Sequence, residues 1–264
     1  AAGGLGRSLG LLGRGAHHDA LLSESASHSA RADRPSPDPD PGLPVPSFHA
    51  ALFDLDGTLV DSLPGIANAL NAALEEHGHP GHPEERVRTF IGNGSRMLCH
   101  QALPEELRSS TTDTIHAAFM KHYDEAWREG TKLYPGIREL LAELTGHLPL
   151  AILSNKPHSF TVEMADHLFP GQFAVVLGHR DGEPRKPDPA GALEISELLG
   201  VAAADTAFIG DSTVDHETAV RAGMHSLLVS WGYHTRARLM ATSAPLLDSP
   251  EELQRRLRGP HREG

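Results

Sequence analysis

Short apolar runs recur from residue 49 onward and alternate with segments that have the 3.6-residue periodicity of amphipathic helices. The runs are "HAALFD" (49–54), "PLAILS" (149–154), "FAVVL" (173–177), "TAFIG" (206–210), "SLLVS" (226–230) and "APLLD" (244–248). Strands that alternate with helices are typical of a parallel sheet with crossover helices. The pattern predicts an α/β fold, a Rossmann-like doubly wound parallel sheet.

One segment breaks the alternation. Residues 64–132 have helical periodicity almost throughout and contain no good strand. About seventy residues are too many for one crossover, because its loops are usually a few residues long. The pattern predicts an α-helical cap (64–132) inserted into a core formed by 48–63 and 133–256, with "LYPGI" (133–137) as the hinge and 257–264 as a C-terminal tail.

Composition separates the beginning of the chain from the rest. Residues 1–47 lack Phe, Tyr and Trp, are rich in Gly, Ala and Ser, and finish in a Pro-rich stretch. Such a composition cannot bury enough apolar surface to offset the entropy of ordering. Residues 1–47 are therefore predicted to be disordered.

Charge and cysteine content narrow the partners and the compartment. The 264 residues include 35 acidic and 23 basic side chains, a net charge of −12, which opposes binding to nucleic acid. Cys99 is the one cysteine and suits a reducing compartment, so the cytoplasm is predicted. No apolar run approaches the roughly 20 residues of a membrane span, so no membrane partner is expected. The chain is expected to be a monomer or a homodimer.

Polar residues of a particular kind follow the predicted strands. In open α/β sheets, active sites form at the carboxyl ends of the strands. Carboxylates at these ends suit a hard divalent cation such as Mg²⁺, while a lysine and small hydrogen-bond donors suit a phosphoryl group. The residues concerned are Asp54, Asp56, Ser154, Asn155, Lys186, Asp211 and Asp215.

Four motifs in order, "DLDGT" (54–58), "LSNK" (153–156), "RKPDP" (185–189) and "GDSTVD" (210–215), resemble those of the haloacid dehalogenase-like phosphohydrolases. The resemblance covers about residues 48–256, and the insert resembles that family's helical cap. Within the family, "DGTLVDS" (56–62), "FIGNGSRML" (90–98), "YPGI" (134–137) and "SNKP" (154–157) are most similar to phosphoglycolate phosphatases and their close relatives.

The resemblance implies a role for each site residue. Asp54 is the expected nucleophile, which forms an aspartyl-phosphate, and Asp56 is the expected general acid and base. Mg²⁺ is expected on Asp54, Asp211 and the Asp56 backbone carbonyl, and Asp215 is expected either to bind the ion directly or to orient metal-bound water. Ser154 and the Asn155 amide are expected to bind a phosphoryl oxygen, and Lys186 is expected to compensate the charge of the phosphoryl group and the nucleophile. Thr58 is expected to support the nucleophile loop.

Each residue also has a purely structural interpretation. Asp54 and Asp56 could cap a turn, Ser154 and Asn155 could cap a helix, and Lys186 could be a solvated surface charge. Asp215 could interact favourably with the positive end of the helix dipole at a helix N-terminus. Lys156 is predicted to be a surface residue.

The cap should decide the substrate, because such lids close over the site and exclude water. In "IGNGSR" (91–96), Gly92 and Gly94 leave backbone amides open just before a predicted helix, a favourable place for an anion, so Asn93 and Gly94 are candidate substrate-binding residues. Arg96 could bind a carboxylate, which would fit a small phosphorylated acid such as 2-phosphoglycolate. The alternative is a loop with Ser95 as the helix N-cap.

The sequence therefore predicts a Mg²⁺-dependent phosphatase of a small phosphorylated metabolite, with 2-phosphoglycolate as first choice. Other substrates in the same class are inorganic pyrophosphate, a nucleoside monophosphate or a sugar phosphate. The similar sugar-phosphate mutases usually have a β-branched apolar residue at the position of Thr58, which disfavours a mutase. A dehalogenase would not need Asp56. A catalytically silent binding protein of the same fold is the alternative from another class.

Overall fold

The structure is a computed structural model that describes residues 47–259. All but the last residue of the predicted disordered tail, and residues 260–264 of the predicted C-terminal tail, lie outside the described residues. Among the described residues, no helix combines the length and the apolar character that crossing a bilayer requires.

Six strands form one parallel sheet in the order β5-β4-β1-β6-β7-β8. They are β1 (Ala50–Phe53), β4 (Leu150–Pro157), β5 (Val175–His179), β6 (Thr206–Gly210), β7 (His225–Val229) and β8 (Leu246–Leu247). All six predicted strands are present, which confirms the α/β class. Strands buried on both faces produce the nearly unbroken apolar runs seen in the sequence.

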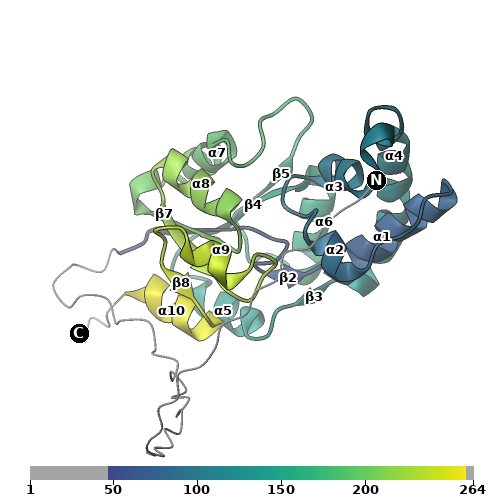
Figure 1. The fold of residues 1–264 in the computed structure, drawn as a ribbon. Helices are drawn as coiled ribbons and strands as arrows, with labels where there is room; N and C mark the ends of the chain where they lie inside the picture. The colour runs from purple at the N-terminus through teal and green to yellow at the C-terminus, as the bar shows by residue number, and fades with distance from the viewer. Residues whose placement is uncertain (1–46, 260–264) are drawn as a thin grey trace, which may run out of the picture. The chain divides into compact units, whose positions relative to one another are not determined.

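Helices cover both faces of this sheet. In Figure 1, α7 (Ala190–Leu199) and α8 (Thr213–Ala222) lie above the strands, and α5 (Ile137–Leu144) and α10 (Pro250–Arg258) lie below them. Because successive side chains of a strand point to opposite faces, Leu52 packs with the first pair of helices and Phe53 with the second. The doubly wound architecture follows from this alternation.

Two further helices complete the core, α6 (His158–Leu168) beside β4 and β5, and α9 (Arg236–Met240) after β7. The ends of several helices have recognisable signals in the sequence. The hydroxyls of Ser212 and Ser249 cap the N-termini of α8 and α10, and Gly200 and Gly223 end α7 and α8 in the left-handed conformation. Helix α10 continues to Arg258, beyond the predicted end of the core at residue 256.

Four helices fill the segment for which the sequence predicts a cap: α1 (Leu63–Glu76), α2 (Glu84–Arg88), α3 (Ser95–Ala102) and α4 (Arg108–Gly130). We call these four helices the cap, and they gather at the right of Figure 1. Helices α1 and α4 cross closely because glycines meet at the crossing. A Cβ atom on Gly130 would lie 2.3 Å from the Cα of Gly65.

The sequence pattern predicts no strand at the two connections between core and cap, but the structure has one at each. Strand β2 (Val60–Asp61) pairs antiparallel with β3 (Lys132–Leu133), with Val60 opposite Leu133. A two-residue strand is too short to produce a periodic pattern, which explains why sequence analysis misses it. The pair ties together the two chain segments that enter and leave the cap.

Candidate active site

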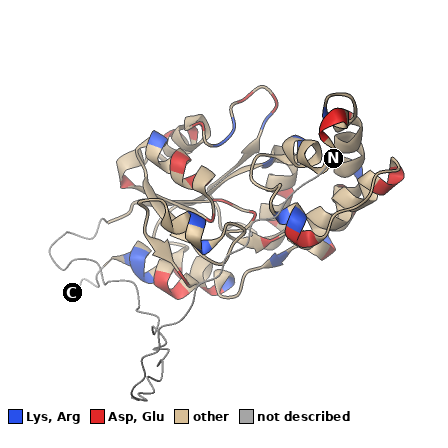
Figure 2. Ribbon diagram, in the orientation of Figure 1, with Lys and Arg blue, Asp and Glu red and all other residues tan. Residues whose placement is uncertain are grey.

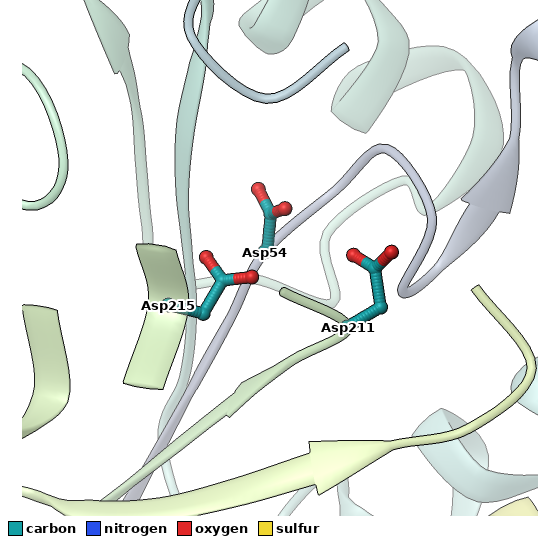
Figure 3. Close-up of side chains that lie close together, drawn as sticks. All are labelled: Asp54, Asp211 and Asp215. Atoms are coloured by element: carbon teal, nitrogen blue, oxygen red, sulfur yellow. The ribbon is translucent and has the colours of Figure 1, made fainter. Parts of the chain in front are cut away.

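The carboxyl ends of three neighbouring strands bring the main candidate residues together. Strand β1 lies between β4 and β6, so Asp54, which follows β1, is at the centre. Asp211 follows β6 directly, and Ser154 lies in the second half of β4, just after Leu153, where the register with β5 begins to shift. Figure 3 shows the Asp54, Asp211 and Asp215 carboxylates facing a common space. A parallel sheet produces this convergence because all its strands end at one edge.

The three aspartates form a group that could hold a metal ion. One carboxylate oxygen from each of Asp54, Asp211 and Asp215 lies within 4.8 Å of the others, and all three residues are buried. Burial raises the pKa of the Asp54 carboxyl to about 7, an effect that the Lys186 ammonium only partly offsets. Burial, reinforced by Asp215 and Asp54, raises the pKa of Asp211 to about 8. Buried oxygen ligands that repel one another fit a hard divalent cation, because it would compensate their charge.

Lys186 supplies the cation of this group. Its Nζ lies 2.6 Å from Asp215 Oδ1 and 2.9 Å from Asp54 Oδ1, and its side chain is almost completely buried. Burial opposes the charged ammonium, but Asp215 and Asp54 outweigh it and raise the pKa of Lys186 above its ordinary value. The surface interpretation of Lys186 is therefore wrong, and a fixed positive charge adjoins Asp54.

Asp211 is held by the loops around it. The Tyr233 backbone N–H donates to Asp211 Oδ2 at 2.6 Å, and the Thr58 hydroxyl donates to Oδ1 at 3.3 Å. Gly57 has a φ of +87°, and a Cβ atom there would lie 2.5 Å from Asp211 Oδ2. Only glycine fits both the conformation and the space. Thr58 thus supports the Asp211 carboxylate across the site.

Asp215 has two structural partners, one on each carboxylate oxygen. Its Oδ2 accepts hydrogen bonds from the Ser212 backbone N–H (3.1 Å) and hydroxyl (2.6 Å) at the start of α8, and its Oδ1 accepts from Lys186. The Ser212 hydroxyl in turn accepts from the Asp215 N–H, a capping box. Asp215 therefore makes the contacts of an acidic residue at a helix N-terminus and also lies beside Asp54 and Asp211.

Lys156 corrects a prediction, because it is not a surface residue. Its Nζ donates to Asp56 Oδ1 (3.0 Å) and Oδ2 (2.8 Å), and its side chain is 5% exposed. Asp56 also accepts a short hydrogen bond from the Ser62 hydroxyl. Burial disfavours the Lys156 ammonium, yet Asp56 and Tyr123 raise its pKa above the ordinary value. The position of Lys156 directly after "SN" at a strand end was the signal that could have indicated this role.

Ser154 and Asn155 differ in what they offer. Both line the cavity beside Asp54. The Asn155 side-chain amide donates to the backbone carbonyls of Gly92 (2.8 Å) and Lys186 (3.0 Å), and its oxygen accepts from the Lys186 N–H (2.9 Å). This side chain therefore joins the core to the cap. Neither residue caps a helix through its side chain, since α6 begins after Pro157 without such a bond.

The cavity above the aspartates has a volume of about 70 Å³ and lies between core and cap. Its polar floor is Asp54, Asp56, Ser154, Lys156, Lys186 and Asp211, and cap residues such as Ile66, Ile91, Leu98, Phe119 and Met120 make an apolar roof. Gly92, Gly94 and Ser95 line the edge where α3 begins. A small ligand that reaches the aspartates must therefore fit beneath the apolar cap side chains.

The predicted cap site is only partly brought to this cavity. Gly94 lines it, but Asn93 is exposed and is not a lining residue. Arg96 is a correction: its Nε donates to Asp113 Oδ1 at 2.7 Å on the exposed side of the cap, so the guanidinium does not reach the cavity. Ser95 does not cap α3 either, because its hydroxyl bonds to His116 Nε2 (2.8 Å).

The raised carboxyl pKa values predict how stability depends on pH and metal. A folded-state pKa above that of the unfolded chain means that the folded protein binds more protons, so metal-free stability should fall from about pH 4 to about pH 8. A divalent cation that replaces the protons should reverse this loss. We expect Mg²⁺ to raise the melting temperature more at pH 8 than at pH 6, measured by thermal unfolding. Equal shifts at both pH values, or none, would contradict a cation at these carboxylates.

Comparison with known proteins identifies the protein family to which this chain is similar. The sequence model described as haloacid dehalogenase-like hydrolase matches residues 51–229. A phosphoglycolate phosphatase from Pseudomonas syringae pv. tomato is 36% identical over 210 residues, 76% of this chain and 77% of that protein. A phosphoglycolate phosphatase from Chromobacterium violaceum is 33% identical over 198 residues, 73% and 89% respectively. A solved structure from Lactobacillus delbrueckii subsp. bulgaricus has a TM-score of 0.76 and 29% identity, covering 80% of this chain and 98% of that one.

The parallel sheet, the aspartates at its edge and the match across most of the chain agree with one another. The chain belongs to the haloacid dehalogenase-like hydrolase family. Within that family it is a phosphatase of the phosphoglycolate phosphatase-like group. Phosphatases of this family generally use a divalent metal, and the buried aspartates fit one.

Proposed function

We propose that this protein hydrolyses a small phosphomonoester, 2-phosphoglycolate first, through an aspartyl-phosphate on Asp54. The observation that carries the proposal is the position of Asp54: it lies among buried carboxylates, with the Lys186 ammonium 2.9 Å from its Oδ1. A carboxylate held in this way can attack phosphorus, because nearby positive charge offsets the repulsion between two anions. The relatives named above favour phosphoglycolate as the substrate.

In the first step a carboxylate oxygen of Asp54 would form a bond to phosphorus as the bond to the leaving alcohol oxygen breaks. Asp56 would give its proton to that oxygen. In the second step water would attack the aspartyl-phosphate, Asp56 would take the proton from the water, and Asp54 would leave as the free carboxylate. Each proton that Asp56 donates is thus recovered within one turnover.

The surrounding residues would bind and orient the phosphoryl group. We propose that Ser154 and the Asn155 backbone receive a phosphoryl oxygen and that Lys186 offsets its charge. Asp54, Asp211 and the Asp56 carbonyl would hold Mg²⁺, which when bound supplies positive charge to the phosphoryl oxygens. Asp215 would act from outside the metal ligands, since Lys186 and Ser212 already occupy its two oxygens.

The substrate's carboxylate would face the start of α3. Gly94 and Ser95 line the cavity there, and free backbone N–H groups at a helix N-terminus favour an anion. Arg96 has no part in this proposal. The cavity of about 70 Å³ suits a leaving group of a few heavy atoms.

We further propose a cytoplasmic protein that works on a small metabolite as a monomer or homodimer, without nucleic acid. The net charge of −12 supports the last point. Figure 2 shows Lys and Arg scattered among acidic residues along the ribbon, which differs from the basic stripe that phosphate-backbone binding uses.

Phosphate release from a panel of substrates, with and without Mg²⁺, tests the proposal. We expect the largest kcat/KM on 2-phosphoglycolate and loss of activity when a chelator removes the metal. Preference for inorganic pyrophosphate, a nucleoside monophosphate or a hexose phosphate would move the substrate assignment within the class. If phosphate is released from none of them, the phosphatase proposal is wrong and a catalytically silent binding protein is favoured.

A further inference from the structure

A second buried lysine lies in the site and has no role in the steps described so far. Lys156 and Lys186 are the cationic side chains among the residues that line the cavity. Lys186 is bonded to Asp54 and Asp215, whereas Lys156 binds Asp56 alone among the carboxylates of residues 47–259. The two lysines therefore serve different aspartates.

The contacts of Asp56 distinguish its two oxygens. Oδ1 accepts from both Lys156 and the Ser62 hydroxyl, while the contacts of the described residues give Oδ2 a single bond, from Lys156. A carboxylate oxygen has two lone-pair sites, so Oδ2 retains one for a proton. Ser62 is itself fixed, because its N–H donates to the Tyr233 hydroxyl at 2.9 Å. Lys156 and Ser62 together hold the carboxylate in one orientation.

A cap residue covers the other side of the Lys156 ammonium. The ring of Tyr123, on α4, lies with its centroid 4.7 Å from Lys156 Nζ. Phe119 stacks on that ring and Phe160 meets it edge-on, so two aromatic neighbours hold the ring in place. Tyr123 is buried, and the paired side chains of Lys156 and Asp56 are 5% and 11% exposed. Ion pairs are stronger where water is excluded, so the position of α4 affects how firmly Asp56 is held.

We propose that Lys156 is a positioning residue that orients the Asp56 carboxylate for proton exchange, and that Tyr123 makes this orientation depend on the cap lying over the site. The proposal rests on the proposed function, in which Asp56 gives a proton to the leaving oxygen and later takes one from water. It connects the cap to the proton step, because the ring that covers the Lys156 ammonium belongs to α4.

The test separates substrates that need a proton from one that does not. Lys156→Met keeps the length of the side chain and removes its charge. On 2-phosphoglycolate, kcat should fall roughly 100-fold while KM changes by less than about threefold, because general acid-base catalysis is lost and binding is retained. The rapid burst of p-nitrophenolate from p-nitrophenyl phosphate should stay within about threefold, because this weakly basic leaving group needs no proton. Lys121→Met, on the exposed side of α4, is the matched control and should change neither rate.

A second pair of variants tests the link to the cap without removing a charge. Tyr123→Leu removes the ring and should lower kcat on 2-phosphoglycolate about 10-fold, and Tyr123→Phe, which keeps the ring, should lose less. This pair decides the proposal if Lys156→Met does not fold. Equal losses on both substrates, or no loss on either, would overturn the positioning role while leaving the phosphatase intact. A wild-type protein inactive on both substrates would instead refute the proposed function.

Discussion

Asp54→Asn should abolish turnover, with phosphate release falling on the order of 10⁴-fold or more, because an amide cannot attack phosphorus as a carboxylate does. The substitution conserves volume, and Asp215 still pairs with Lys186, so the fold should persist. Initial rates of phosphate release measure the first effect, and circular dichroism and thermal unfolding measure the second.

The matched control is Asp124→Asn. Asp124 is an exposed acidic residue of α4 with no role in the proposed chemistry, so this variant should retain the wild-type rate. Acid-quenched wild-type enzyme should carry covalent phosphate during turnover, and the Asp54→Asn variant should carry none. Appreciable residual turnover in a pure preparation would contradict the assignment of Asp54 as nucleophile and point to direct attack by water.

Lys186→Met is expected to damage both stability and activity. The lysine is the shared partner of two buried carboxylates, so its loss leaves Asp54 and Asp215 repelling each other. Breaking a buried ion pair from one side costs about 3–5 kcal/mol. For a domain of this size that is a fall in melting temperature of roughly 10 °C. Activity should fall by about 10²–10³-fold, the range seen when one stabilising group of a transition state is removed.

Lys132→Met provides the comparison for Lys186→Met, since Lys132 is an exposed lysine of β3 whose loss should change the melting temperature little. Mg²⁺ should recover part of the stability lost by Lys186→Met, because added positive charge again compensates the aspartates. An unchanged melting temperature in metal-free Lys186→Met would show that the carboxylates have another compensation.

Much of this fold is readable from the chain because parallel strands buried on both faces leave continuous apolar runs. The six runs identified in the sequence correspond to the six strands of the sheet. Asp54 and Asp211 are readable for a related reason, as each directly follows such a run and so must lie at the same edge. The motifs around them also resemble those of a known family.

Other features were beyond the reach of a linear pattern. Strands β2 and β3 have two residues each, and their pairing joins positions about seventy residues apart. The prediction for Arg96 failed because helical spacing does not say which neighbour a long side chain will meet, and here it meets Asp113. Asp215 was open to two interpretations in sequence, and in the structure one of its oxygens bonds to Lys186 and the other to Ser212.

By itself, the sequence determined the class of fold and the edge of the sheet at which the aspartates meet, and its motifs resemble those of a known family. These features depend on the order of residues within short segments of the chain. Only the tertiary structure decided which carboxylates the two buried lysines contact. Lys156 was predicted at the surface and Lys186 in the site, yet both are buried: Lys156 pairs with Asp56 beneath a cap tyrosine, and Lys186 pairs with Asp54 and Asp215. The partner of a flexible charged side chain is set by which carboxylate is buried within its reach, and that is a property of packing between segments distant in sequence.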